Sequence, residues 1–207
     1  MNHPHTPIRS APELAYSGEV WRKLLHLVAL IIPVGYYFVA RPVGIGIVAS
    51  CFVVSLLIDI SRFRDWPIQR TWQRVVSPIV RPKESDNFTG ATHILLSGWL
   101  CPLLFTRPAA AFAMTTIILG DIAAALIGRR WGRHRYAGNR SWEGSAAFFG
   151  GGLIAAFAIP SVPLSIGIPV ALLAAVVEGL SRRVDDNLTV PLVAGLAVHV
   201  ALRALPL

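Results

Sequence analysis

The chain alternates long apolar runs with short polar connections, and this pattern predicts a bundle of membrane helices. A helix rises about 1.5 Å per residue, so a membrane span needs roughly 17–25 apolar residues. Seven runs reach or approach that length, so the expected fold is an all-α, polytopic integral membrane bundle. The expected spans are Leu24–Ala40, Pro42–Ile60, Ala91–Phe105, Pro108–Gly128, Gly144–Pro160, Pro163–Leu180 and Leu188–Leu205.

The composition agrees with a membrane protein. Hydrophobic residues make up 54% of the 207 residues and charged residues only 14%, so a soluble domain of this length would expose large apolar patches. We expect residues 1–18 to form a short polar N-terminal segment and residues 19–207 to form a single transmembrane domain. The polar connections near 61–90, 129–143 and 181–187 are the expected cytoplasmic loops.

The distribution of Lys and Arg predicts how the bundle is oriented. Three of the 19 residues, Arg41, Arg107 and Arg203, lie on the side of the short turns, and the other 16 lie at the N-terminus or in the long connections. Because cytoplasmic loops carry the excess of Lys and Arg, the N-terminus is expected in the cytoplasm and the C-terminus outside. The net charge of +8 reflects this orientation, so the lipid bilayer, and no nucleic acid, is the expected partner.

Acidic residues gather at the cytoplasmic ends of the expected helices and indicate a metal site. Asp121 lies inside an apolar run, where an aspartate costs about 2.5–3.5 kcal/mol and therefore indicates function. Asp59, by contrast, is expected to pair with Arg62 one turn later. Asp185 and Asp186 precede the last run, where capping of the helix N-terminus is the alternative explanation. Mg²⁺ takes one or two carboxylates together with nucleotide oxygens, so the candidate ligands are Asp121, Asp185 and Asp186.

A glycine-spaced, arginine-rich connection between the fourth and fifth runs is the candidate phosphate site. Its backbone N–H groups can surround phosphate oxygens, and the next helix adds its positive dipole end. Helix packing and the orientation rule are alternative explanations for the same glycines and arginines. The candidate nucleotide-binding residues are Gly128, Arg129, Gly132, Arg140, Ser141, Gly144 and Ser145 from this connection, and Asn187 from the start of the last run.

Further polar residues open the first and third expected helices at the same end of the bundle. For the lysine among them the alternative is anchoring at the membrane surface, and for each histidine it is a neutral place in the core. The candidates of this group are Lys23, His26, Thr89, Thr92 and His93.

Five motifs together resemble a known family, the CTP-dependent lipid-alcohol kinases, which include dolichol kinase, phytol kinase and the CTP-using diacylglycerol kinase. The family is distantly similar to phosphatidate cytidylyltransferases, whose longer aspartate- and lysine-rich signature is not found in this sequence. The motifs occur in family order as Arg-Lys-Leu-Leu-His (22–26), Thr-Gly-Ala-Thr-His (89–93), Gly-Asp-Ile-Ala-Ala-Ala-Leu-Ile-Gly-Arg-Arg-Trp-Gly-Arg (120–133), Asn-Arg-Ser-Trp-Glu-Gly-Ser (139–145) and Glu-Gly-Leu-Ser…Asp-Asp-Asn-Leu-Thr (178–189).

The resemblance implies a kinase domain that uses CTP and Mg²⁺ and acts on a membrane lipid with a hydroxyl group. The expected reaction transfers the γ-phosphate of CTP to a polyprenol, dolichol, phytol or diacylglycerol at the cytoplasmic face of a bacterial-type inner or plasma membrane. Where family members often have Lys, this chain has Arg140, which would bind phosphate in bidentate geometry. The candidate catalytic residues are Asp121, Lys23 and three proton acceptors among which the sequence does not choose, Glu143, Glu178 and His93.

Two alternative functions belong to other classes. The first is a cytidylyltransferase that attacks the α-phosphate of CTP and makes a CDP-lipid. The second is a non-enzymatic membrane transporter, although transporter sites usually lie near the bilayer midplane, whereas the acids here lie toward one end of the helices. The sequence leaves the acceptor lipid open, and it leaves the oligomeric state open, a homo-oligomer included.

Overall fold

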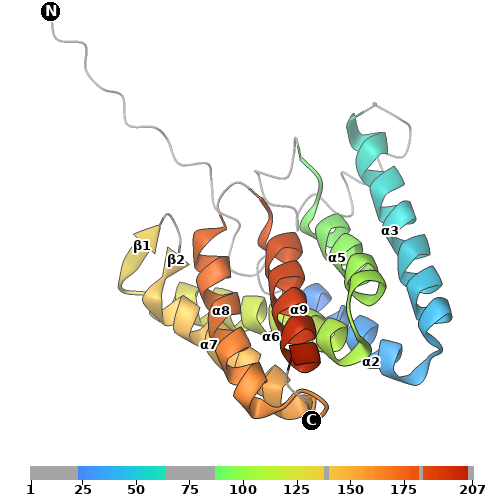
Figure 1. The fold of residues 1–207 in the computed structure, drawn as a ribbon. Coiled ribbons are helices and arrows are strands. Elements are labelled where there is room, and N and C mark those ends of the chain that lie inside the picture. The colour runs from blue at the N-terminus through green and yellow to red at the C-terminus, as the bar shows by residue number, and fades with distance from the viewer. Residues whose placement is uncertain (1–22, 64–86, 138–139, 182–183, 205–207) are drawn as a thin grey trace, which may run out of the picture.

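The computed structural model describes residues 23–63, 87–137, 140–181 and 184–204, and this part of the chain is mostly helical (Figure 1). The predicted N-terminal segment and most of the first expected loop lie outside these ranges. A helical segment over 23–28 comes first. It is followed by α2 (Ile31–Phe38), α3 (Arg41–Phe63), α5 (Gly90–Leu104), α6 (Arg107–Trp131), β1 (Arg135–Ala137), β2 (Arg140–Ser141), α7 (Trp142–Ala158), α8 (Leu164–Leu180) and α9 (Asp186–Ala204).

The helical class predicted from the apolar runs is confirmed, and three helices in the described part are long and apolar enough to cross a bilayer. They are Arg41–Ser61 within α3, α6 and α9, while shorter apolar helices cover Lys23–Phe38, Gly90–Leu104 and Leu164–Leu180. Seven crossings therefore remain a prediction. The structure also adds the small antiparallel hairpin β1–β2, which the sequence analysis placed in a loop.

The first expected span is broken at residues 29 and 30. Ala29 and Leu30 donate their backbone N–H groups three residues back, to His26 and Leu27, at 3.0 Å each. Pro33 lies just beyond the break, and a proline both lacks an N–H donor and clashes with the carbonyl four residues earlier, here that of Ala29. The proline therefore explains why one apolar run forms two helical segments.

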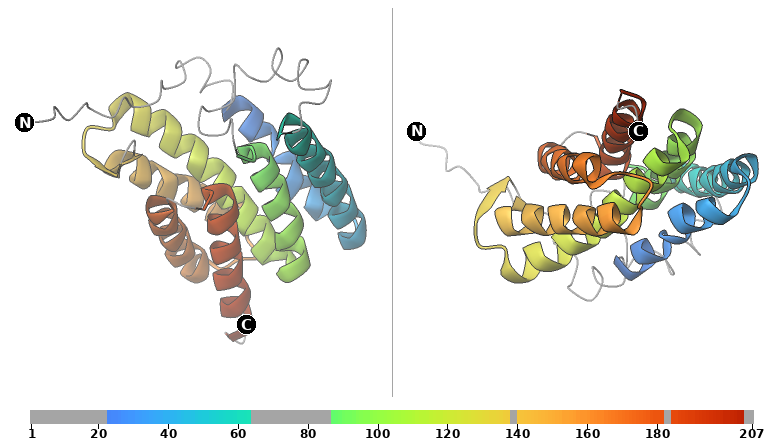
Figure 2. Two further views of the ribbon diagram at one scale, coloured as in Figure 1. Left: turned by 90° about the horizontal axis from the view of Figure 1, so that it is seen from above. Right: turned by 60° about the horizontal axis from the view of Figure 1, so that its bottom comes forward.

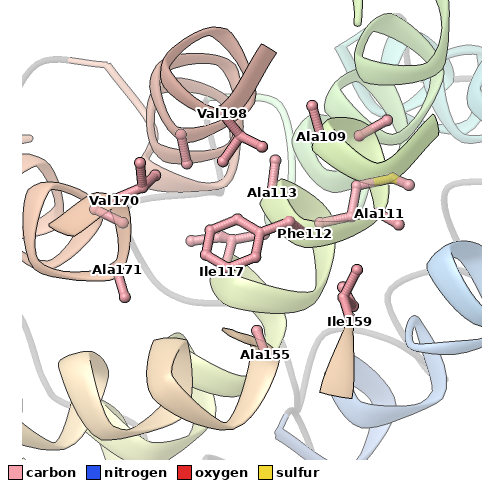
Figure 3. Packing of buried hydrophobic residues seen from close by; sticks show 14 of the residues in the cluster. Ala109, Ala111, Phe112, Ala113, Ile117, Ala155, Ile159, Val170, Ala171 and Val198 are labelled. Atoms are coloured by element: carbon pink, nitrogen blue, oxygen red, sulfur yellow. The ribbon is translucent and has the colours of Figure 1, made fainter. Parts of the chain in front are cut away.

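The central helix of the bundle is α6, which packs against α2, α5, α7, α8 and α9. It runs obliquely across the other helices (Figure 2). Its first half is buried on all sides, and in Figure 3 Phe112 and Ile117 lie between Ala155 of α7 and the residues Val170 and Val198 of α8 and α9. A helix that is apolar all round is a core helix, so the second half of α6 starts inside the bundle, where it carries Asp121, and has the exposed Arg130 near its end.

Helices α6 and α7 approach one another through glycine. A Cβ atom built on Gly151 would lie 2.7 Å from the backbone nitrogen of Gly120, and a Cβ on Gly120 would lie 2.7 Å from the ring of Phe148. Small residues allow two helix backbones to come this close. The pair is therefore held by backbone contact, which fixes the positions of the site residues that both helices carry.

Two arginines at the other end of the bundle satisfy helix C-termini. Arg41 donates to the carbonyl of Pro102 from Nε at 3.1 Å and from Nη2 at 2.7 Å, and Arg107 donates from Nη2 to the carbonyl of Val39 at 3.1 Å. The last carbonyls of a helix have no intrahelical donor, and arginine both pairs with them and complements the helix dipole. These two residues therefore close α5 and α2.

Candidate functional site

The deepest charge in the central helix is Asp121, and it is paired with a buried lysine. Helix α6 continues to Trp131, beyond the predicted end at Gly128, so Asp121 lies ten residues, or about 15 Å, from that end. Lys23 donates from Nζ to Asp121 Oδ2, and the lysine is only 2% exposed. His26 Nε2 lies 3.5 Å from the same carboxylate oxygen. The structure thus joins three of the predicted site residues across the first helical segment and α6.

A second charged group, formed by Arg140 with two carboxylates, lies where α7 begins and α8 ends. Arg140 Nε lies 3.1 Å from Glu178 Oε1, and its Nη2 donates to Asp186 Oδ2 at 3.3 Å. The same guanidinium donates from Nη1 to the carbonyls of Gly179 at 3.2 Å and Ser181 at 2.6 Å. Its described acceptors are protein oxygens, so it is already well satisfied in this structure.

Glu178 connects the two groups. It is 9% exposed, and both Asp121 and Asp186 lie near enough for their charges to act on it. Carboxylates from α6, α8 and α9 therefore lie within electrostatic reach of Glu178, with Asp121 paired to Lys23 and the other two paired to Arg140. Buried carboxylates of like charge repel one another unless cations or hydrogen bonds compensate them. The site therefore has the charge pattern of a place that receives a cation or a cationic complex.

Asp185 and Asn187, at the start of α9, form hydrogen bonds with each other. Asp185 Oδ1 accepts from Asn187 at the backbone nitrogen, 3.0 Å, and at Nδ2, 2.8 Å, as the capping alternative expects, and a role of Asp185 in holding a metal remains a prediction. Asn187 is 5% exposed, and its buried Oδ1 has no hydrogen-bond partner among the described residues. Within the described ranges, no three His, Cys, Asp or Glu side chains gather closely enough to hold a metal ion.

Glu143 lies at the first turn of α7 and contacts His134, the residue before β1. His134 contacts Glu143 Oε1 through Nδ1 at 2.7 Å, and the His134 backbone N–H donates to the same carboxylate. The hydrogen bond from the His134 side chain lowers the pKa of the Glu143 carboxyl to about 2. Such a carboxylate is a weak base at neutral pH. Of the three predicted proton acceptors, Glu143 is therefore the least suited by its surroundings.

The predicted phosphate loop forms a compact junction between α6 and α7. Ser141 caps α7 by accepting from the Gly144 backbone at 3.1 Å. A Cβ on Gly128 would lie 3.4 Å from Gly144 Cα, and a Cβ on Gly132 would lie 2.5 Å from Ser141 Oγ. In the structure these residues pack the helix ends together, as the packing alternative proposed. Ala124 and Gly128, which follow Asp121 on α6, therefore lie directly against Gly144 of α7.

Two other predicted residues flank this junction. Arg129 lies in the last turn of α6, where a cation complements the helix dipole. Ser145 Oγ lies 2.7 Å from the hydroxyl of Tyr136 on β1, which fixes the hairpin on α7. A role of either residue in binding phosphate remains a prediction.

The other predicted residues belong to a separate polar cluster between α3 and α5. Asp59, 1% exposed, accepts at Oδ2 from the Thr89 backbone at 2.8 Å and from Thr92 Oγ1 at 2.7 Å. His93 Nδ1 contacts the Thr89 carbonyl at 3.0 Å. The expected partner of Asp59 was Arg62, whose side chain is outside the described part. The signal that found Asp121, an acid inside an apolar run, applies equally to Asp59, but the sequence did not indicate that Thr89 and Thr92 would be its partners.

An apolar cavity of about 460 Å³ lies at the opposite end of the bundle, lined by Pro33, Phe38, Ala111, Thr115, Ile159 and Ser161 among others. It involves α2, α6 and the turn after α7. Its lining carries no Asp, Glu, Lys, Arg or His, so the charged cluster and this cavity are chemically distinct.

Comparison with known proteins places the chain among lipid kinases. It is 28% identical to the phytol kinase of Synechocystis over 84% of this chain and 76% of that protein. It is also 28% identical to CTP-dependent diacylglycerol kinase 1 of Schizosaccharomyces pombe, over 63% of this chain and 62% of that enzyme. An uncharacterized protein of Rickettsia prowazekii is 29% identical over 86% of this chain and 91% of its own length.

No family model matches the chain, and no solved structure matches it. The chain is thus homologous, at 25–28% identity, to phytol kinase and to the CTP-dependent diacylglycerol kinases, which supports the predicted resemblance to the CTP-dependent lipid kinases.

Proposed function

We propose that the protein transfers the γ-phosphate of CTP to the hydroxyl group of a membrane lipid alcohol. The observation that carries this proposal is the pair of cation–carboxylate groups, Lys23 with Asp121 and Arg140 with Glu178 and Asp186, whose charges act on one another at Glu178. Phosphoryl transfer needs mainly positioning and charge neutralisation, and this cluster supplies both. Relatives named for phytol and for diacylglycerol make a polyprenol, phytol or diacylglycerol the acceptors to test.

Mg²⁺ fits the donor set of this site. The ion usually binds through one or two carboxylates and through substrate phosphates, and the carboxylates of Asp121 and Asp186 both lie within electrostatic reach of Glu178. The buried, unpartnered Oδ1 of Asn187 is one more oxygen donor at the start of α9. We assign Asp121 and Asp186 to holding the ion, which would neutralise the charge on the CTP phosphates when bound.

Each side chain of the cluster has its own proposed role in the reaction. Glu178 accepts the proton of the lipid hydroxyl, whose oxygen attacks the γ-phosphorus of CTP. The bond from that phosphorus to the bridging oxygen of the β-phosphate breaks, and CDP leaves with the bonding electron pair. Lys23, held by Asp121, stabilises the charge that develops on the transferred phosphoryl group. Arg129 and the junction between α6 and α7 are the proposed contacts for the remaining phosphates.

The kinase is distinguished from a cytidylyltransferase by which phosphate moves. Purified protein in mixed micelles is given Mg²⁺, CTP labelled at either the α or the γ position, and a panel of polyprenols, phytol, diacylglycerol and phosphatidate. We expect only the γ label to enter the lipid phase, with release of CDP.

Label entering lipid from α-labelled CTP, with release of pyrophosphate, would instead establish the cytidylyltransferase. Failure of both labels across the whole panel would count against either enzyme and would favour the transporter. The lipid that accepts the γ label identifies the acceptor, and a reaction without enzyme is the control.

The cytoplasmic location of the site is also part of the proposal, together with a bacterial-type inner or plasma membrane. The predicted orientation puts the loop at Gly138 inside and the turn at Ser161 outside. Single cysteines introduced at these two positions, in a chain whose own Cys51 and Cys101 are replaced, are expected to react with an impermeant thiol reagent from opposite sides of the membrane. Reaction of both from one side would contradict the seven-span topology.

A further inference from the structure

The guanidinium of Arg140 is bound at all three of its nitrogen atoms. Nε lies 3.1 Å from Glu178 Oε1, Nη2 donates to Asp186 Oδ2 at 3.3 Å, and Nη1 donates to two backbone carbonyls at 3.2 and 2.6 Å. The side chain is 22% exposed. Four acceptors around one planar fork define a single orientation, because the five donors of a guanidinium are rigidly arranged.

The four acceptors come from segments that the chain itself does not hold together. Glu178 and Gly179 are in the last turn of α8, Ser181 follows that helix, and Asp186 opens α9. Arg140 is in β2, directly before α7. The two carbonyls are among those that a helix C-terminus leaves without donors. One side chain therefore joins the start of α7 to both sides of the α8–α9 connection.

We propose that Arg140 is a positioning residue, which fixes Glu178 and Asp186 relative to one another, and that it does not bind the phosphates of CTP. This inference rests on the proposed function of the same site and corrects the role that the sequence suggested for Arg140. To reach a phosphate, the guanidinium would have to leave both carboxylates that it now contacts. A buried carboxylate that loses its cation is strongly destabilised, so this movement opposes binding.

The two roles predict opposite behaviour of a lysine at this position. A lysine supplies a point charge, which is sufficient for phosphate but cannot meet four acceptors in fork geometry. If Arg140 positions the carboxylates, Arg140→Lys and Arg140→Gln should both lower kcat per folded molecule by about tenfold or more, with the KM for CTP changed by less than about threefold. The matched control is the same pair of changes at exposed Arg203 in the last turn of α9, at the opposite end of that helix from Asp186, which should leave both constants unchanged.

Near-normal kcat in Arg140→Lys, with a KM for CTP that rises mainly in Arg140→Gln, would overturn the inference and return Arg140 to the phosphate. Normal kcat per folded molecule in both variants would also overturn it, because the arginine would then serve stability alone. Each outcome is distinct from failure of the proposed function, in which the wild-type protein transfers no label from CTP to lipid.

A second measurement does not depend on activity. Thermal unfolding of the detergent-solubilised protein without CTP is compared for Arg140→Gln, Glu178→Gln and the double variant. A positioning contact predicts that the two changes are coupled, so the double variant loses less than the sum of the single losses. Additive losses would show that the contact between Arg140 and Glu178 does not exist in the protein without nucleotide, and would contradict the inference.

Discussion

Replacement of Asp121 by asparagine is expected to lower turnover by about 10²–10³-fold, the range seen when one group that stabilises the transition state is removed. The substitution keeps the shape of the side chain and removes its charge. The carboxylate both holds Lys23 and is the proposed anionic ligand of Mg²⁺, so its loss weakens charge neutralisation on CTP. Insertion into the membrane should be normal, because a neutral side chain costs less in the bilayer than a charged one.

The buried pair provides a control for this prediction. If Asp121 serves only to neutralise Lys23, then Asp121→Asn should lower the yield of folded protein but keep near-normal turnover per folded molecule, and adding Lys23→Met, which removes the second charge, should restore the yield. A catalytic Asp121 predicts low turnover per folded molecule in Asp121→Asn at any yield. Initial rates of γ-label transfer, measured at equal amounts of folded protein, distinguish the two. Near-normal rates in Asp121→Asn itself would assign the aspartate to structure.

Substitution of Gly151 by alanine is expected to destabilise the protein by about 1–3 kcal/mol or more, as overpacking does in a tight core. The new methyl group would lie 2.7 Å from the backbone of Gly120. A backbone cannot move aside as a side chain can, so α6 and α7 would have to separate. The expected observation is a lower unfolding temperature and a lower yield of folded protein in detergent.

The neighbouring residue supplies the matched control. A Cβ on Gly150 meets no atom within 4 Å, and alanine is favoured over glycine in a helix by up to about 1 kcal/mol. Gly150→Ala should therefore leave the unfolding temperature unchanged or raise it. Equal destabilisation by the two changes would show that helix propensity, and not the contact between α6 and α7, governs this region.

The helices were predictable because lipid requires long apolar runs, whereas their ends and breaks depend on particular residues. The run from Leu24 to Ala40 contains Pro33, which breaks it in the structure. Helix α6 continues through Arg129 and Arg130 because arginine is a good helix former, although both residues end the apolar pattern. The hairpin had a signal that was not used, since Gly-Asn at 138–139 is typical of a two-residue hairpin connection.

The sequence predicted which charged residues belong to the candidate site, but not which of them contact one another. Asp121 stood out because a carboxylate in an apolar run is costly. The sequence indicated the charge of Arg140 but not its acceptors, two of which are backbone carbonyls of the α8 terminus. Those acceptors exist only once α8 ends beside β2. Pairing across helices depends on how they pack, and one sequence does not contain that information.

The pairing of Lys23 with Asp121 has a consequence for biosynthesis. The two residues are separated by 98 positions, and chains are elongated at about 5–20 residues per second, so the lysine emerges roughly 5–20 s before its partner. Until then the aliphatic part of the lysine side chain can lie in the membrane while its ammonium group reaches the aqueous surface. The first helical segment can therefore dock against α6 only after that helix has been synthesised, and the catalytic cluster is completed late in assembly.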